Sequence, residues 1–311
     1  MKKLNPILAG LVIMALAACN KDLGGASVPA AASPEEGRPE VAFRLGGEFA
    51  PHMETRATEI TDSNLGTLYV TATTGTSSET AVSGFTSVSF SKSGGVYKGG
   101  KYWPSTNPNY HFYAGNVALT HTSTGATVSP ANAGTDVVVG YIATPDYEET
   151  NDLTLKHIFA RFTDVTLKAP AGYTASAIKL SIQPKTSGTY NLKSDSWTTK
   201  GSAGSAVYLA GTASSGLSIT SAGGSVSVNS NDLYLVPDSY TLTLTYTLAK
   251  GDWSKAYSKT ASVTVLQGKK NKITLVGDAA NIPDPDDGDI SEVDFNVEVD
   301  PWTENELHPN F

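Results

Sequence analysis

Two short stretches near opposite ends of the chain share one pattern of apolar and polar residues. Residues 41–45 read Val-Ala-Phe-Arg-Leu, and residues 293–299 read Val-Asp-Phe-Asn-Val-Glu-Val. Successive side chains of a strand point to opposite faces, so each stretch offers one apolar row and one polar row. We therefore expect a half-buried strand at each end of the chain.

The same alternation recurs at regular spacing through the body of the chain, separated by glycine-rich turns. Beyond the first twenty residues, no stretch of eleven or more residues shows a helical period. Many short strands with glycine-rich turns are typical of β-sandwiches, so the sequence predicts an all-β fold. The clearest rows are Leu68-Val70-Ala72, Tyr110-Phe112-Ala114, Ile178-Leu180-Ile182 and residues 240–248.

Two places in this body depart from simple alternation. The pair Gly99-Gly100 lies between two apolar runs and predicts a tight hairpin turn, because glycine supplies the positive φ that such a turn needs. Between Leu153 and Leu167 the apolar row changes phase, with Ala160 and Phe162 out of step with both. A phase change requires a bulge or a change of sheet.

The polar residues 145–151 precede this phase change, and we place a domain boundary there. The expected domains are residues 41–150 and residues 151–281, similar in style but without an exact repeat. Residues 282–311 are expected to form an acidic Pro/Asp linker followed by the last strand. The aspartates of this linker do not have the spacing of a calcium-binding loop, so we interpret it as solvated.

The amino-terminal end has the pattern of a secretory signal. Lys2 and Lys3 precede a short apolar run that is too short to span a membrane as a helix. The run ends in Leu-Ala-Ala-Cys, which resembles the bacterial lipobox and implies cleavage after residue 18 and lipid attachment to Cys19. An ordinary signal with a chance cysteine is the alternative, but Cys19 is the only cysteine of the chain. Residues 19–40 are rich in Ala, Gly, Ser and Pro and predict a flexible tether.

Composition and charge exclude several classes of function. The net charge is −8, and the lysine and arginine residues form no cluster larger than Lys269-Lys270, so we expect no nucleic-acid binding. A single cysteine rules out disulfides and cysteine-based metal sites.

No catalytic motif is present, so we expect no enzyme activity, cofactor or metal. The five histidines are scattered, and His157 is expected to be a hydrogen-bonded core residue. An aromatic group has two interpretations, a platform for stacking sugars or part of a core, and we favour the core. Its members are Tyr102, Trp103, Tyr110, Phe112 and Tyr113.

The order of several short motifs resembles fimbrillins, the pilin subunits of type V pili in Bacteroidales. Each motif alone is degenerate, but together they cover nearly all of the mature chain. They are the lipobox, Thr-Arg-Ala at residues 55–57, Tyr-Trp-Pro at 102–104 with the aromatic residues 110–113, and then residues 155–160, residues 233–237 and a last strand near Trp302.

This resemblance implies two tandem transthyretin-like, Greek-key β-sandwich domains and export as an outer-membrane lipoprotein. It also implies an arginine-specific protease that cuts after the first strand. Carried onto this chain, the cut falls between Arg56 and Ala57. Arg38 and Arg44 are rivals, but Arg38 precedes a proline and Arg44 would lie within a paired strand.

The first strand, within residues 41–49, would then be a temporary occupant of a groove, held there by Val41, Phe43 and Leu45. The resemblance implies that the last strand of another fimbrial subunit replaces it, through Val293, Phe295, Val297, Val299 and Trp302. The alternative is that the last strand pairs within its own domain.

The expected function is that of a structural subunit of a cell-surface fimbria that supports adhesion. The alternatives are a fimbrial tip or anchor subunit, and a monomeric surface lipoprotein that binds glycans.

Overall fold

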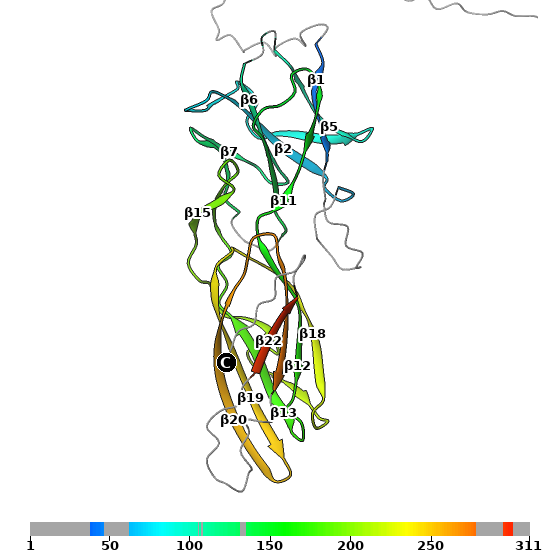
Figure 1. The fold of residues 1–311 in the computed structure, drawn as a ribbon, viewed down its shortest axis with the longest axis vertical. Helices are drawn as coiled ribbons and strands as arrows, with labels where there is room; N and C mark the ends of the chain where they lie inside the picture. Colours follow the sequence, from blue (N-terminus) through cyan, green and yellow to red (C-terminus); the bar gives the residue numbers. More distant parts are fainter. Residues whose placement is uncertain are drawn as a thin grey trace, which may run out of the picture. The chain divides into compact units, whose positions relative to one another are not determined.

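A computed structural model describes residues 38–46, 62–104, 106, 108–130, 135–277 and 295–300. Every regular element within these residues is a β-strand, and the strands form four sheets (Figure 1). The all-β fold predicted from the alternating pattern is therefore confirmed.

The largest sheet has nine strands in the order β10-β1-β5-β4-β2-β6-β9-β11, with β3 paired to β2. It folds over its own core. The ring of Phe43 on β1 lies 5.0 Å from that of Phe112 on β6, although β5, β4 and β2 separate these strands in the sheet. The strands are β1 Glu40–Leu45, β2 Thr67–Thr74, β3 Thr80–Ala81, β4 Val88–Ser93, β5 Val96–Tyr102, β6 Tyr110–Gly115, β9 Val138–Ile142, β10 Thr150–Leu153 and β11 Lys156–His157.

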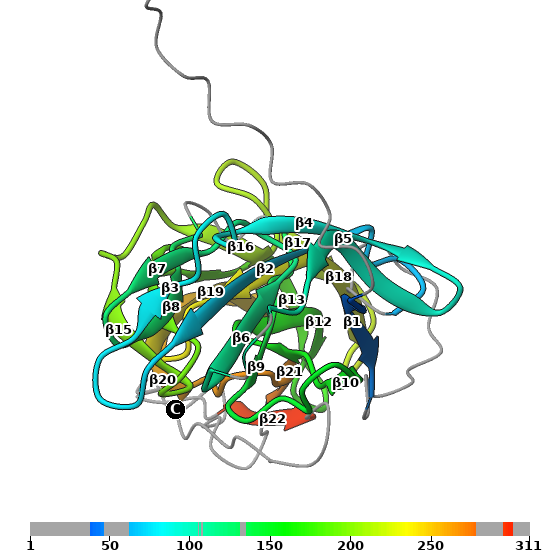
Figure 2. The ribbon, with the colours of Figure 1, turned by 90° about the horizontal axis from the view of Figure 1, so that it is seen from above.

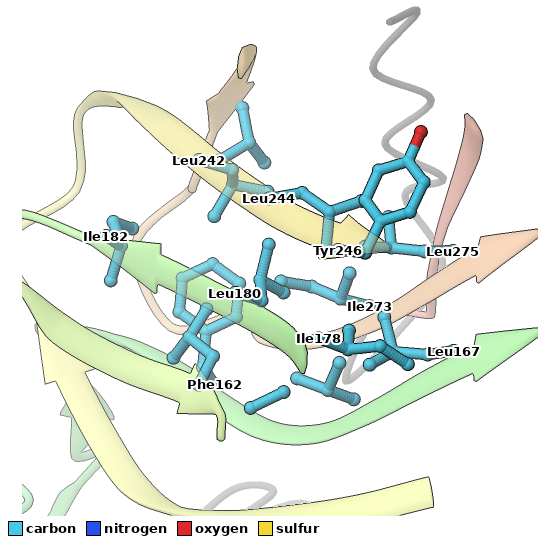
Figure 3. Close-up of a cluster of buried hydrophobic side chains, with 14 of the residues drawn as sticks. Phe162, Leu167, Ile178, Leu180, Ile182, Leu242, Leu244, Tyr246, Ile273 and Leu275 are labelled. Carbon is cyan, nitrogen blue, oxygen red and sulfur yellow. The ribbon is translucent and has the colours of Figure 1, made fainter. Parts of the chain in front are cut away.

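Two further sheets enclose a second core. One has the order β18-β12-β21-β22, and the other has the order β16-β13-β19-β20 with β17 paired to β13. Figure 3 shows apolar side chains of β12, β13, β19 and β21 pointing toward one another. The strands are β12 Ala160–Lys168, β13 Thr174–Ile182, β16 Val207–Ala210, β17 Leu217–Ile219, β18 Ser225–Leu235, β19 Ser239–Lys250, β20 Trp253–Thr264, β21 Lys270–Gly277 and β22 Phe295–Asp300.

The fourth sheet joins segments that are distant in the sequence. Its order is β15-β14-β8-β7, formed by β7 Thr120–Thr122, β8 Gly125–Val128, β14 Gly188–Asn191 and β15 Ser196–Lys200. A third group of buried residues packs here, including Tyr113, Phe159, Tyr190 and Tyr234. The alternation of single strands did not predict this sheet, because it depends on pairing across about sixty residues of chain.

The phase change in the middle of the chain has both of the predicted causes. Strand β11 ends the nine-stranded sheet, and β12 begins three residues later in a different sheet. Within β12 the pairing to β21 shifts register between Phe162 and Val165, which is a bulge. The domain boundary at residue 150 stays a prediction, and we note that β10 and β11 beyond it still belong to the first sheet.

Candidate functional site at the first strand

Strand β1 lies inside the nine-stranded sheet rather than at its edge (Figure 2). On one side it pairs in parallel with β10, from Ala42 opposite Thr150 to Leu45 opposite Leu153. On the other side it pairs antiparallel with β5. We call the space that β1 fills between β5 and β10 the β1 site.

The apolar row of β1 is anchored in the core by Phe43. Its side chain is 0% exposed, and its ring lies 5.6 Å from the ring of Phe90 and 5.0 Å from that of Phe112. Val41 is also buried, whereas Leu45 is half-buried and packs against the same core. The predicted row of Val41, Phe43 and Leu45 therefore faces inward, and Phe43 makes the largest contribution to it.

Opposite Val41, strand β5 carries a bulge at Gly99 and Gly100. Glu40 pairs with Tyr102 and Ala42 with Lys98, so extra residues of β5 face one residue of β1. Gly100 adopts a φ of 66°, and its N–H donates a 2.7 Å hydrogen bond to the carboxylate of Glu40. The β1 site thus includes a backbone donor that Glu40 satisfies.

The prediction of a hairpin turn at Gly99-Gly100 is wrong. Strand β5 runs continuously through these glycines, and the turn between β4 and β5 lies at Gly94-Gly95, both with positive φ. Packing explains Gly99, because a Cβ there would lie 2.5 Å from the ring of Phe90. The glycine pair serves close packing and a bulge, which local turn rules do not distinguish from a hairpin.

The outward row of β1 carries charges that match its neighbours. The carboxylate of Glu40 lies 3.6 Å from the ammonium of Lys98 on β5. Arg44 lies 3.5 Å from Asp152 on β10, with side chains that are 60% and 65% exposed. Such exposed pairs contribute little to stability, but they distinguish one register of the strand from another.

A cavity of about 90 Å³ lies beside β1 and is lined by Val41, Phe85, Trp103 and Tyr110, among others. Trp103 is 1% exposed, and its indole N–H has no hydrogen-bond partner among the described residues. Of the five aromatic residues that suggested either a core or a sugar platform, only Tyr102 is exposed, at 43%. The other four are buried, so the core interpretation is confirmed for them.

The predicted residues of the last strand fall partly in β22. This strand pairs antiparallel with β21 of the same chain, with Val299 opposite Ile273 and Val297 opposite Leu275. Phe295 stands opposite Gly277. The structure of the isolated chain therefore has the last strand at the edge of its own sheet. Val293, Trp302, Cys19, Arg56 and Ala57 lie outside the described residues.

A buried polar centre that was not predicted from the sequence joins Glu79, just before β3, to Lys193, two residues beyond β14. The side chain of Glu79 is 1% exposed and accepts hydrogen bonds from Thr73 at 2.5 Å and Tyr113 at 2.8 Å. Lys193 adds an ion pair at 2.5 Å. Burial alone would raise the pKa of Glu79, but these three donors outweigh it and hold the pKa below its ordinary value. This centre links the two halves of the chain.

The remaining candidate groups have structural partners. His157 is bonded through its Nδ1 to Asp136 at 2.9 Å, as expected for a core histidine. The described residues contain no group of three or more side chains that could hold a metal ion. Within the same residues, no helix is long and apolar enough to cross a membrane.

Comparison with known proteins identifies the family of this chain. The model of a family described as fimbrillin-like matches residues 55–302. A crystal structure of a candidate cell adhesion protein from Bacteroides ovatus is 12% identical, covers 86% of this chain and 98% of its own, and has a TM-score of 0.49. A corresponding protein from Bacteroides uniformis is 15% identical, covers 86% and 100%, and has a TM-score of 0.47. No curated protein matches the chain.

Proposed function

Because this chain belongs to the fimbrillin-like family, we propose that it is a structural subunit of a cell-surface fimbria that polymerises by strand exchange. In this proposal the precursor is exported as a lipoprotein through Cys19, and an arginine-specific protease cuts after Arg56. Strand β1 then leaves with the lipid, and the last strand of another copy fills the β1 site. The assembled fimbria supports adhesion.

The observation that carries the proposal is the position of β1. It is an interior strand of its sheet, yet it precedes the proposed cut, whereas every other strand of that sheet follows it. A single break after Arg56 would leave β1 attached by non-covalent contacts alone. The rival Arg44 lies within β1 itself, where pairing on both sides hinders a protease that needs extended, accessible backbone.

The energetics of the β1 site favour replacement over an empty groove. Burying Val41 and Phe43 stabilises the domain by about 1.5–3 kcal/mol for each side chain. Backbone hydrogen bonds to β5 and β10 add about 1 kcal/mol each. Their sum is comparable to the entire stability of a domain, about 5–15 kcal/mol. A cut subunit that loses β1 should therefore bind a replacement strand tightly.

Limited digestion of the purified precursor with trypsin tests this function. We expect one early cut that leaves Ala57 as the new amino terminus, followed by a ladder of polymers on a gel. An Arg56→Ala variant should resist both steps, while Arg44→Ala, as the matched control, should behave like the unaltered protein. Complete cleavage at Arg56 that leaves only monomers would contradict polymerisation.

The pairing of β22 with β21 in the same chain favours a second candidate, a tip or anchor subunit that does not donate its last strand. An anchor would keep both its lipid and β1. The amino-terminal residue of protein recovered from cells separates the two candidates. Ala57 would indicate a processed structural subunit, and a lipidated Cys19 would indicate an anchor.

A further inference from the structure

We propose that the strand replacing β1 enters in one defined register, in which Phe295 of a second copy takes the place of Phe43. In the same register Glu292 takes the place of Glu40, Val293 that of Val41, and Val297 that of Leu45. The positive charge of Lys98 on β5 favours this alignment over the others. This inference rests on the proposed function, and it specifies which contacts the partner strand must make.

The match begins in the sequence. Strand β1 reads Glu-Val-Ala-Phe-Arg-Leu from residue 40, and residues 292–297 read Glu-Val-Asp-Phe-Asn-Val. Three of six positions are identical, and Val297 substitutes an aliphatic side chain for Leu45. The two positions without a match are Ala42, which is only 3% exposed, and Arg44, whose side chain is 60% exposed. An aspartate in the place of Ala42 would therefore need a cation beside it, and Lys98 on β5 stands directly opposite.

The inward row selects this register through the phenylalanine. The position of Phe43 is enclosed by the rings of Phe90 and Phe112. A shift of two residues would put valine or another smaller side chain there. Removing a buried ring without refilling its volume is strongly destabilising, so alignments without a phenylalanine at this position are disfavoured.

The outward row selects the register through charge. In the structure Lys98 stands directly opposite Ala42 and lies 3.6 Å from the carboxylate of Glu40. In the proposed register Glu292 takes over the bond to the N–H of Gly100, and Asp294 stands opposite Lys98. Lys98 would then face two carboxylates instead of one, and opposite charges across a strand pair are stabilising.

The reversed strand direction is the main competitor, because residues 292–298 are nearly symmetric about Phe295. With Phe295 in the same place, reversal would put Asn296 rather than Asp294 opposite Lys98. It would also replace the parallel ladder to β10 by an antiparallel one. The residue opposite Lys98 therefore reports both the direction and the register.

Disulfide trapping between two copies tests the proposal. One copy carries Lys98→Cys, and the other carries either Asp294→Cys or, as the matched control, Asn296→Cys. Both copies are cut with trypsin to remove the segment that contains Cys19, mixed and oxidised. Directly opposed residues of antiparallel strands lie within the span of a disulfide, whereas residues two positions along do not.

We expect a disulfide-linked dimer with Asp294→Cys and little or none with Asn296→Cys. A dominant product with Asn296→Cys would overturn the proposed alignment, as would polymers that form without either cross-link. Failure of the unaltered cut protein to polymerise would instead count against strand exchange itself, so the two failures are distinguishable.

Charge exchange provides a second, independent readout. Lys98→Glu should slow polymer formation several-fold, and combining it with Asp294→Lys in the donor should restore much of the rate. Lys255→Glu makes the same charge change at an exposed residue of β20 and should leave the rate of polymer formation unaltered. Equal effects at Lys98 and Lys255, or no recovery in the charge exchange, would contradict a role for Lys98 in alignment.

Discussion

Strands β1 and β22 have nearly the same pattern of residues but different surroundings. Strand β1 pairs on both sides, with β5 and β10, whereas β22 occupies the edge of its sheet and pairs only with β21. Alternation thus predicts which residues of a strand share a face, but not how many neighbours the strand has. The comparison also shows that the interior strand, not the edge strand, is the one that the proposed cut would release.

The largest effect should come from removing the ring at the centre of β1. We expect Phe43→Ala to lower the free energy of unfolding of the uncut chain by about 3–5 kcal/mol, because the ring is buried between Phe90 and Phe112. Val297→Ala in the edge strand β22 should lower it by less. Denaturant titration measures both, and equal losses would contradict the distinction between interior and edge strands.

A smaller, pH-dependent effect is expected at Glu79, which belongs to neither β1 nor β22. Its folded-state pKa is held below the ordinary value of 4.5, so its ionised form stabilises the fold above that pH, and this contribution is lost as the pH falls through the folded pKa. Glu79→Gln weakens charged hydrogen bonds worth about 1.5–3 kcal/mol at neutral pH. The stability difference from the unaltered chain should narrow below pH 4.5, whereas the effect of Phe43→Ala should not depend on pH. If the difference in the free energy of unfolding between Glu79→Gln and the unaltered chain stays constant on acidification, the role of the carboxylate is refuted.

The packing beneath β1 can be tested from the side of β5. A Cβ at residue 99 would lie 2.5 Å from the ring of Phe90 and 2.9 Å from the carbonyl oxygen of Ser89. We therefore expect Gly99→Ala to destabilise the chain by about 1–3 kcal/mol through overpacking. Gly66→Ala is the matched control, since a Cβ there would meet nothing within 4 Å. Thermal unfolding measures both substitutions. If Gly99→Ala leaves the unfolding temperature unchanged, the side chains of β1 and β4 can move aside to accommodate the added methyl group, contrary to our inference.

The smallest effect should come from the exposed end of β1. Arg44 and Asp152 form an ion pair at 3.5 Å with both side chains mostly exposed, so Arg44→Ala should change the free energy of unfolding by less than about 1 kcal/mol. Raising the salt concentration should reduce even this difference. A larger loss in a denaturant titration would mean that Arg44 contributes more to the stability of the chain than an exposed ion pair does.

Much of the fold follows from local pattern. The rows of β2, β13 and β19 are buried as their alternation predicts, and the phase change before Leu167 marks a real change of sheet. These features are predictable because burial of one face is a property of each strand by itself.

The errors and omissions involve contacts between distant residues. Gly-Gly pairs occur at residues 94–95 and 99–100, and the first pair forms the turn, whereas Gly99 packs against the ring of Phe90. Glu79 was missed because nothing in its neighbourhood of serines and threonines predicts a partner at Lys193. At the candidate site, the inward row of β1 was predictable, but its interior position and the bond from Gly100 to Glu40 were not.

In the proposed assembly, an emptied β1 site is completed by the last strand of another copy. The most direct measurement compares cut full-length protein with a cut variant truncated before Ile290, each alone and then mixed, by the size of the products on a gel. We expect long polymers from the full-length protein, monomers from the variant, and shortened polymers from the mixture, because the variant can accept a strand but cannot donate one. Polymers of equal length from the variant alone would contradict the proposed assembly.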